Sequence, residues 1–304
     1  MNEKLKIFVI VVTYKGKRWY DKCFGSIRES VIPVQVVAVD NSQGTEDANY
    51  IKTHFPEVHL IKTNENLGFG KANNIGMQYA LDNGCDYVFL LNQDAWLDAP
   101  DTLEKLVEIA EQHPEFGILS PMHINIEGQG LVMECFCKQP TNKSLIEDLY
   151  FHQLKDVYET EYIHAAAWLL SRKTLENVGG FDPLFFQYAE DDNYLKRVLY
   201  HGFKVGVCPE TKIVHDHHAS EFSNERSQLR QKQFLLVEWT DINKPLSLRR
   251  LYRYIIRKWM SYFCNGNWTL AKKQLDILRY CVAKRKEIRI SRNENIQEKP
   301  SWLY

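Results

Sequence analysis

The stretch that most constrains the fold is the apolar run Tyr87–Leu91, which stops abruptly at Asn92-Gln93-Asp94. An apolar run without a polar face is typical of a strand buried on both sides in a parallel sheet. In open α/β sheets, ligands bind beyond the carboxyl ends of the strands. Asp94 would then stand at the mouth of a crevice, where its carboxylate could hold a divalent metal or a sugar hydroxyl. Asn and Asp also end strands for conformational reasons alone, so this stretch by itself leaves both interpretations open.

Apolar runs alternate with helical patterns along the first ninety residues. The runs are Ile7–Val12, Val34–Val39, Val58–Ile61 and Tyr87–Asn92, and the helical patterns between them span residues 19–31, 46–55 and 71–81. This alternation predicts an α/β fold with a doubly wound mixed sheet flanked by helices. Further along the chain, Phe203–Cys208 and Lys212–His215 are predicted as two separate strands.

Each of the four early runs ends in polar residues suited to binding. In chain order these are Thr13, Asp40, Asn64 with Asn66, and Asn92 with Asp94. Turns favour such residues for their own reasons, but four successive cases on one edge of one sheet favour a ligand-binding edge.

Three consecutive carboxylates, Glu190-Asp191-Asp192, begin a predicted helix over 189–201. The helix dipole favours negative charge at this position, which is the structural explanation. The preceding aromatic loop, residues 185–188, could also desolvate one carboxylate and raise its proton affinity. A carboxylate in such a place suits general-base chemistry on an alcohol.

A second polar cluster, His215-Asp216-His217-His218, follows the apolar pair Ile213-Val214. Imidazole nitrogens are common metal ligands. His215 lies at a strand end and is the better ligand candidate, whereas His217 and His218 are expected to form a solvated polar turn.

The charge of the chain is distributed unevenly. The 304 residues carry an overall charge of −1, yet the segment from Lys244 to Ile290 holds thirteen lysines and arginines against two carboxylates. We therefore expect an acidic body at residues 1–225 and a C-terminal basic amphipathic helical region at residues 226–304.

Two amphipathic segments make up that C-terminal region. Apolar side chains recur at helical spacing from Leu248 to Phe263 and again from Trp268 to Val282, with basic residues on the remaining faces. One interpretation is two helices packed on the body with a solvated basic face. The other is docking on an anionic membrane surface. Nucleic-acid binding is disfavoured, since no recognised binding motif accompanies the charge.

Several short motifs together resemble the family 2 glycosyltransferases of the GT-A fold, and more narrowly the bacterial rhamnosyltransferase-type members. The resemblance extends from Ile7 to about His215. It is carried by Val11–Tyr14, Val39–Ser42, Asn64–Gly76, Leu90–Asp94, Gly179–Asp182, Glu190-Asp191 and Val214-His215. Each motif is weak alone, but their order and spacing make a strong signal.

The resemblance implies an inverting transfer of a sugar from a nucleotide-diphosphate donor to an acceptor hydroxyl in glycan or polysaccharide synthesis. It makes Asp191 the catalytic base, and it places Asp94 and His215 at a divalent metal, Mn²⁺ or Mg²⁺, on the donor diphosphate. It assigns Trp168 and Glu190 to the acceptor side. The nucleotide-sugar pocket would comprise Thr13, Tyr14, Asp40, Asn66, Gly68, Asn73, Asn92 and Asp94.

Two positions depart from the family pattern. The metal-binding DXD motif is Asn92-Gln93-Asp94 here, so only one carboxylate remains, and weaker metal affinity is expected. The second acid that usually follows the base is Asn193, although Asp192 could partly substitute for it.

Two other functions compete with glycosyl transfer. A sugar-phosphate nucleotidyltransferase should carry a glycine-rich basic loop after its first strand, but residues 13–18 contain a single glycine. A catalytically inactive nucleotide-sugar- or glycan-binding protein is the alternative that the incomplete DXD motif allows.

The acceptor is expected to be a glycan or a lipid-linked glycan. No apolar run approaches the roughly 20 residues that a membrane-spanning helix needs, and no signal peptide is evident. A cytoplasmic location is therefore predicted, with peripheral association at the inner face of the cell membrane through the basic region.

Overall fold

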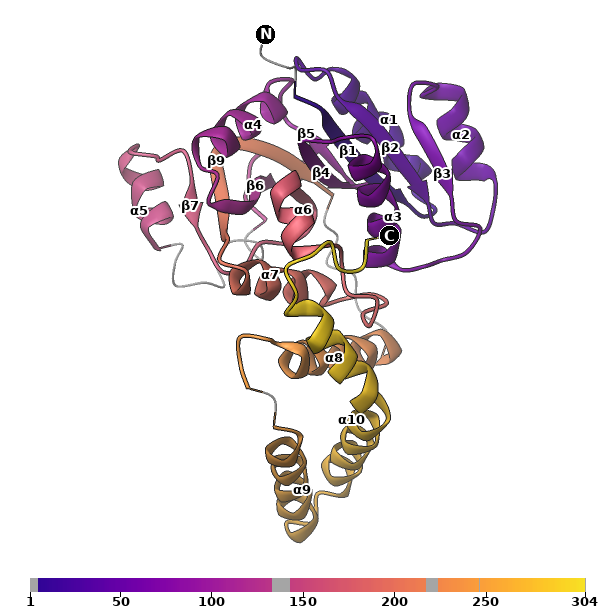
Figure 1. The fold of residues 1–304 in the computed structure, drawn as a ribbon, viewed down its shortest axis with the longest axis vertical. Helices are drawn as coiled ribbons and strands as arrows, with labels where there is room; N and C mark the ends of the chain where they lie inside the picture. The colour runs from indigo at the N-terminus through magenta and orange to yellow at the C-terminus, as the bar shows by residue number, and fades with distance from the viewer. Residues whose placement is uncertain (1–4, 133–142, 217–223, 246, 304) are drawn as a thin grey trace.

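The apolar runs form one mixed β-sheet in the computed structural model, which describes residues 5–132, 143–216, 224–245 and 247–303 (Figure 1). The strands lie in the order β3-β2-β1-β4-β8-β6-β9-β5, and the short β7 pairs with β9. Their bounds are β1 Ile7–Thr13, β2 Gln35–Asp40, β3 His59–Lys62, β4 Tyr87–Asn92, β5 Ala95–Leu97, β6 Phe116–Ile124, β7 Tyr158–Glu159, β8 Ala167–Ser171 and β9 Lys204–His215.

The strands β1 to β4 are parallel, so their carboxyl ends share one edge of the sheet. Thr13 lies opposite Asp40, and Val12 lies opposite Asn92. The polar strand ends recognised in the sequence are therefore neighbours in space. Because the apolar residues of these strands are buried on both faces of the sheet, their register is strongly specified.

The other half of the sheet is mixed. β8 runs antiparallel to both β4 and β6, while β6 and β9 are parallel. The prediction of two strands after Phe203 was wrong, because Lys204–His215 is a single strand. Its pairing jumps from Pro121–Cys208 to Met122–Lys212, so three residues bulge out without ending the strand.

Helices cover both faces of this sheet. Side chains of α3, α6 and α7 pack on one face, and side chains of α1, α2 and α4 pack on the other. The helix bounds are α1 Lys17–Arg28, α2 Glu46–His54, α3 Phe69–Asp82, α4 Thr102–Gln112, α5 Lys143–Phe151, α6 Arg172–Val178, α7 Glu190–Tyr200, α8 Asn224–Thr240, α9 Leu248–Cys264 and α10 Trp268–Asn295. The predicted GT-A-type architecture of a sheet between helical layers is thus present.

The C-terminal region consists of α8 and a helical hairpin formed by α9 and α10, which projects away from the sheet (Figure 1). The helix α8 contacts both α7 and α10. A third hydrophobic cluster joins these helices, and it also contains Phe185 and Ala189 from the loop before α7. The C-terminal helices therefore help to build the loop that leads to the predicted base.

The chain returns to the body after α10. The Gly180 amide donates to the Ser301 carbonyl at 2.8 Å, and the Leu303 side chain is buried in the main core. A Cβ atom on Gly179 would lie 2.0 Å from the Ser301 oxygen, so only glycine fits under this returning segment. Within the described part of the chain, no helix is both long and apolar enough to cross a bilayer.

Candidate active site

The strand ends of β1 and β2 form a buried floor. Thr13 and Asp40 are fully buried, and neither lines the two cavities described below. The Asp40 carboxylate accepts hydrogen bonds from the Ser42 amide and hydroxyl at 3.1 and 2.6 Å. It thereby fixes the turn after β2. The structure places these two predicted nucleotide ligands beneath the site surface.

Two asparagines build the loop before α3. The Asn41 side chain donates to the Asn66 side-chain oxygen at 3.0 Å and accepts from the Leu67 amide at 2.8 Å. The Asn66 oxygen also accepts from the Gly68 amide at 2.9 Å. Gly68 has a φ of +80°, a conformation that glycine adopts without strain. These bonds hold Asn66 and Gly68 in place, and both residues line the larger cavity described below.

Gln93, the middle residue of the incomplete DXD motif, joins two strand ends. Its side-chain oxygen accepts from the Tyr14 amide at 2.9 Å, and its side-chain nitrogen donates to the Tyr14 carbonyl at 3.1 Å. This double hydrogen bond ties the loop after β1 to the loop after β4. Sequence reasoning assigned no role to Gln93, because its partner lies 79 positions away.

A cavity of about 680 Å³ opens over this edge of the sheet. Five of the eight predicted nucleotide-sugar ligands line it, namely Tyr14, Asn66, Gly68, Asn92 and Asp94. The remaining lining residues are Val12, Trp19, Asn41, Phe69, Gln93, Gln187, Tyr188 and Leu229. Leu229 belongs to α8, so the wall of this cavity extends past the boundary predicted at residue 225.

A smaller cavity of about 200 Å³ adjoins the first and shares Phe69, Asn92, Gln187 and Tyr188 with it. All three carboxylates of the predicted catalytic motif line this smaller cavity. Its other lining residues are Tyr162, His164, Ala165, Ala189, Arg230 and Phe234. The two cavities therefore lie next to each other, with Asp94 lining the larger one and Asp191 lining the smaller one.

The backbone just before these carboxylates is strained. Tyr188 and Ala189 have φ values of +69° and +67°, a region that costs a residue with a side chain about 1–3 kcal/mol. The surrounding contacts offset this energetic cost, because Ala189 is buried in the third hydrophobic cluster. The consequence is a sharp entry into α7, which begins at Glu190 with its carboxylates at the cavity.

The carboxylates of α7 lie in different environments. Glu190 is buried, and within the described residues one of its carboxylate oxygens has no hydrogen-bond partner. Burial raises the pKa of Glu190 to about 8, and the nearby charge of Asp191 adds to the rise. Asp191 is only half-buried, and it accepts a hydrogen bond from the Asp192 amide at 3.0 Å. At neutral pH, Glu190 therefore retains its proton beside Asp191.

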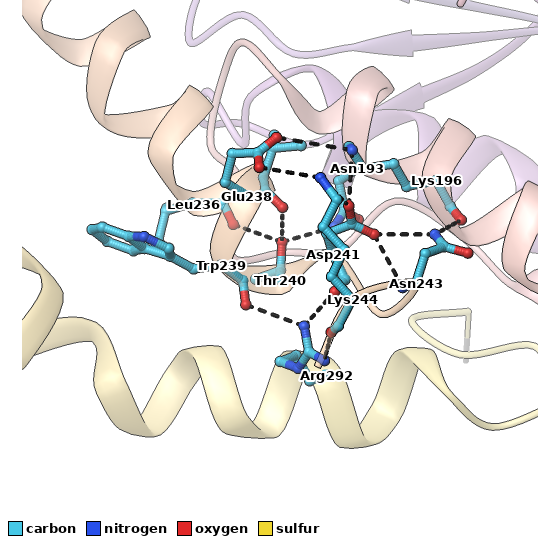
Figure 2. A network of polar contacts seen from close by, with 11 residues as sticks. Asn193, Lys196, Leu236, Glu238, Trp239, Thr240, Asp241, Asn243, Lys244 and Arg292 are labelled. Carbon is cyan, nitrogen blue, oxygen red and sulfur yellow. Dashed lines mark hydrogen bonds and ion pairs between the residues drawn. The ribbon is translucent and has the colours of Figure 1, made fainter. Parts of the chain in front are cut away.

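Asn193, at the position of the second family acid, points away from the cavity. It is buried, and its side chain donates to the Thr240 hydroxyl of α8 at 3.1 Å. Figure 2 shows this bond within a network that joins α7 to the end of α8 and to α10. In the same network, Lys196 lies 3.0 Å from Asp241, and Arg292 donates to backbone carbonyls at the end of α8. Asn193 therefore positions the helix.

Asp94 and His215 come together because β5 runs antiparallel to β9. Ala95 lies opposite His215, and the Asp216 amide donates to the Asp94 carbonyl at 2.9 Å. The Asp94 carboxylate then lies 3.7 Å from Nε2 of His215. A carboxylate and an imidazole at this separation fit a divalent metal after a small side-chain movement.

Two further histidines lie beside this pair. The ligand nitrogens of His123, His164 and His215 are all within 4.8 Å of one another. Sequence reasoning missed His123 and His164, because the order of the strands in the sheet, and no local pattern, brings them next to His215. His217 and His218 lie outside the described residues.

Two predicted site residues lie elsewhere. Trp168 does not line the acceptor side: it is fully buried in β8 and stacks on Phe181, with ring centroids 6.1 Å apart. Trp168 therefore belongs to the main hydrophobic core. Asn73 is buried in α3 and donates to the Phe69 carbonyl at 3.0 Å. It stabilises the first turns of the helix and lines neither cavity among the described residues.

Solved structures with a similar arrangement define the class of fold. The mannosyltransferase PcManGT from Pyrobaculum calidifontis, solved in complex with GDP-Man and Mn²⁺, superposes with a TM-score of 0.56 over 93% of this chain and 76% of its own. At 19% identity this likeness shows the fold alone. It is the GT-A fold of glycosyltransferases, as the sequence predicted.

The sequence then identifies the family. The model for "Glycosyl transferase family 2" matches residues 8–178, more than half of the chain, and the chain belongs to this family. The low-salt glycan biosynthesis hexosyltransferase Agl10 of Haloferax volcanii is 24% identical over 218 residues, or 68% of this chain and 66% of the relative. The N-acetylglucosaminyl-diphospho-decaprenol L-rhamnosyltransferase of Mycobacterium tuberculosis is 25% identical over 236 residues, or 68% and 75%. The chain thus spans roughly two thirds to three quarters of these relatives.

Proposed function

We propose that the protein is an inverting glycosyltransferase that moves a sugar from a nucleotide-diphosphate donor to an acceptor hydroxyl in glycan synthesis. One observation carries the proposal: the cavity lined by Asp94 adjoins the cavity lined by Asp191, and the two share four lining residues. The volume of about 680 Å³ on the Asp94 side is large enough for a nucleotide sugar. The smaller cavity is then the place of the acceptor.

The donor would lie over the strand ends, with its nucleotide against Tyr14, Asn66 and Gly68. Asp94 and His215 would hold a divalent metal, Mn²⁺ or Mg²⁺, at the diphosphate. When bound, such an ion neutralises the negative charge that develops on the leaving diphosphate. PcManGT, which has the same fold, was solved in complex with GDP-Man and Mn²⁺, and this supports a nucleotide sugar and a divalent metal as the groups bound here.

Asp191 would act as the general base. Its carboxylate removes the proton of the acceptor hydroxyl, and the acceptor oxygen forms a bond to the anomeric carbon as the bond from that carbon to the diphosphate oxygen breaks. The products are the glycosylated acceptor with inverted anomeric configuration, the nucleoside diphosphate, and a proton on Asp191. A single displacement of this kind needs the base on the acceptor side. Asp191 lines the smaller cavity, which is the proposed place of the acceptor.

Glu190 would serve the same reaction with a proton on its carboxyl group. A neutral carboxyl at this position donates a hydrogen bond to an acceptor oxygen and adds no second negative charge beside Asp191. The two adjacent acids then have different tasks because their burial differs.

The relatives suggest the substrates. A hexosyl or rhamnosyl donor follows from the names of the two relatives, and a lipid-linked acceptor follows from the decaprenol-linked substrate in one of those names. We propose transfer of this type to a glycan or lipid-linked glycan. The cytoplasmic location expected from the sequence stays a prediction.

Replacing Asp191 by Asn tests the base. Loss of a general base should lower the transfer rate about 10²- to 10⁴-fold, while calorimetric binding of the nucleotide-sugar donor should stay nearly unchanged. The matched control is Asp192→Asn on the same turn, which should retain most of the activity. Full activity in Asp191→Asn would refute the role, and loss of activity only in Asp192→Asn would move the base by one residue.

The projecting hairpin is the proposed contact with a membrane surface. At its tip, the rings of Phe263 and Trp268 lie 4.8 Å apart, and both side chains are exposed. Arg257, Lys272 and Lys273 are exposed close to this tip along the two helices. Aromatic side chains next to basic ones fit an anionic lipid surface, where each basic residue contributes about 1 kcal/mol. Such docking would bring a lipid-linked acceptor near the enzyme.

Vesicle co-sedimentation tests the contact. The protein should sediment with phosphatidylglycerol vesicles at low salt, should be released at high salt, and should ignore phosphatidylcholine vesicles. The double variant Lys272→Glu/Lys273→Glu should lose this binding, whereas Lys52→Glu on α2 should keep it. Absence of binding to the anionic vesicles at low salt would refute the membrane contact.

A further inference from the structure

Three histidines from three different parts of the chain lie close together near Asp94. His123 comes from β6, His164 from the segment just before β8, and His215 from the end of β9. Because β8, β6 and β9 are neighbours in the sheet, the topology brings these residues together from positions 41 to 92 residues apart. The ring centroids of His123 and His164 each lie 5.6 Å from that of His215, and 6.4 Å from one another.

The cluster has the features of a built site. His123 and His215 are buried, while His164 is half-buried and lines the smaller cavity. The Ser120 hydroxyl lies 3.3 Å from Nε2 of His123, a contact that can fix the orientation of the ring. Asp94 approaches His215 from the side of the larger cavity. An ion held by this cluster would therefore lie where the two cavities meet.

The dimensions suit one ion. Metal–nitrogen bonds of about 2.0–2.1 Å place two imidazole nitrogens on the same ion about 3.4 Å apart in tetrahedral geometry. The three nitrogens lie within 4.8 Å of one another, so side-chain movements of about 1 Å would bring all three to bonding distance from one ion. Three imidazoles with one carboxylate form a nitrogen-rich donor set, and imidazole suits first-row transition metals, whereas Mg²⁺ takes oxygen ligands and keeps several waters.

We propose that His123, His164 and His215, with Asp94 as the oxygen ligand, form a transition-metal site that selects Mn²⁺, Co²⁺ or Zn²⁺ over Mg²⁺. The inference rests on the proposed function, because it specifies the metal of the same donor site. It also accounts for Asn92: two additional imidazoles replace the carboxylate that the incomplete DXD motif lacks. His123 and His164 are thus ligands that the sequence motif does not contain.

The experiment titrates the metal-free, full-length protein with CoCl₂, MnCl₂ and MgCl₂, using calorimetry and, for Co²⁺, visible absorption. We expect one Co²⁺ ion per chain, with an intense visible absorption band of the kind that four-coordinate Co²⁺ gives. We expect that Mg²⁺ at equal concentration does not displace the Co²⁺ ion. His123→Ala and His164→Ala should each weaken Co²⁺ binding at least tenfold. His54→Ala, on the exposed surface of α2, is the matched control and should leave the binding unchanged.

His123 is in the core, so its variant could lose stability. Circular dichroism of each variant and the milder His164→Gln at the half-buried position keep the test decisive. Mg²⁺ binding as tight as Mn²⁺ binding would overturn the proposal. So would unchanged Co²⁺ affinity in both folded histidine variants, because a site of Asp94 and His215 alone would then suffice.

The metal test and the activity test can fail separately. Calorimetry reports the ion whether or not a suitable donor and acceptor are known. A protein that transfers sugar at full rate after EDTA treatment and binds no Co²⁺ would refute the histidine site and leave the role of Asp191 intact. A protein that binds Co²⁺ through the histidines but keeps full activity in Asp191→Asn would refute the base and leave the site.

Discussion

At the scale of single residues, the site depends on polar side chains whose hydrogen bonds hold the loops around the cavities. Gln93 is the clearest example: it occupies the variable position of a metal-binding motif, yet both ends of its amide group bond to the Tyr14 backbone. Tyr14 in turn lines the larger cavity. The shape of the larger cavity therefore depends on the residue between Asn92 and Asp94.

Replacing Gln93 by Ala should weaken donor binding. Two hydrogen bonds worth about 0.5–1.5 kcal/mol each are lost, and the loop after β1 is released. We expect the dissociation constant for a nucleoside diphosphate to rise about tenfold, as measured by calorimetry with the nucleotide that gives the largest thermal shift. Gln78→Ala, on the exposed surface of α3, serves as the control, and equal affinity in Gln93→Ala and the wild type would contradict the prediction.

The raised pKa of Glu190 predicts that the stability of the folded protein depends on pH. Its pKa is near 4.5 in an unfolded chain and rises to about 8 in the folded protein. The folded state therefore binds the proton more tightly, and this stabilisation is complete below about pH 4.5 and is lost as the pH rises through about 8.

Glu190→Gln removes the titrating group. Between pH 5 and pH 8.5, the free energy of unfolding of the wild type should fall relative to that of Glu190→Gln, by a few kcal/mol. Denaturant unfolding at the two pH values measures the difference. Glu108→Gln on an exposed part of α4 should follow the wild type, and parallel curves for Glu190→Gln would show that the raised pKa is wrong.

At the scale of elements, the entry to α3 and the entry to α7 are built against each other. A Cβ atom on Gly68 would lie 1.8 Å from the Phe186 carbonyl oxygen. Gly68 precedes α3, and Phe186 belongs to the strained loop that precedes α7. The two loops that frame the junction of the cavities are therefore in direct contact.

Gly68→Ala should disturb both loops. The positive φ and the close carbonyl together predict a destabilisation of about 2–4 kcal/mol, with loss of donor binding. The control is Gly44→Ala, where a Cβ atom meets nothing within 4 Å and a change within about 0.5 kcal/mol is expected. Chemical unfolding and calorimetry measure the two effects, and equal stability of both variants would contradict the proposed contact.

At the scale of the whole molecule, the C-terminal helices are part of the machinery around α7. Asp182 accepts hydrogen bonds from Ser291 and Asn295 of α10 at 2.5 and 2.9 Å, just ahead of the strained loop. The network of Figure 2 ties α10 to α8, and α8 to α7. A change in the position of the hairpin is thereby mechanically connected to the helix that carries Asp191.

Arg292→Met tests this connection. The guanidinium group donates to the Trp239, Asp241 and Lys244 carbonyls, so its loss should cost about 2 kcal/mol and lower Tm by a few degrees. We also expect slower transfer, since α8 supports α7. Arg289→Met, an exposed neighbour on α10, should change neither quantity. A stable and fully active Arg292→Met variant would show that the hairpin and the catalytic helix are independent.

Local patterns predicted much of this molecule and missed what depends on distant partners. The apolar runs predicted the parallel strands, and parallel strands necessarily bring Thr13, Asp40 and Asn92 to one edge. Which of these side chains would reach the cavity was not predictable, because the burial of Thr13 and Asp40 depends on the loops packed above them. Likewise, Trp168 packs against the rings of Phe181 and Tyr194, and no local signal indicates that these distant residues cover it.

The histidine cluster and α8 were missed for a related reason. His123, His164 and His215 are far apart in sequence, and only the order β8-β6-β9 makes them neighbours. The segment that forms α8 is polar at its start, and its buried residues Leu236 and Trp239 gain their partners from α9, α10 and the loop before α7. A pattern in one segment cannot report a surface that four segments create together.

Under the proposed membrane docking, the length of α10 would set the distance between the lipid surface and the catalytic domain. Its 28 residues amount to about 42 Å of helix, which separates the aromatic tip from the residues beside Asp182. With the hairpin upright on a bilayer, a sugar carried close to the lipid headgroups would remain tens of ångströms below Asp191, and only a long glycan would reach it. With the hairpin lying along the surface, a short acceptor would suffice. Under this docking, the tilt of α9 and α10 would determine the length of the acceptor that reaches the site. Shortening both helices by whole turns should shift the acceptor preference of the enzyme toward shorter glycans.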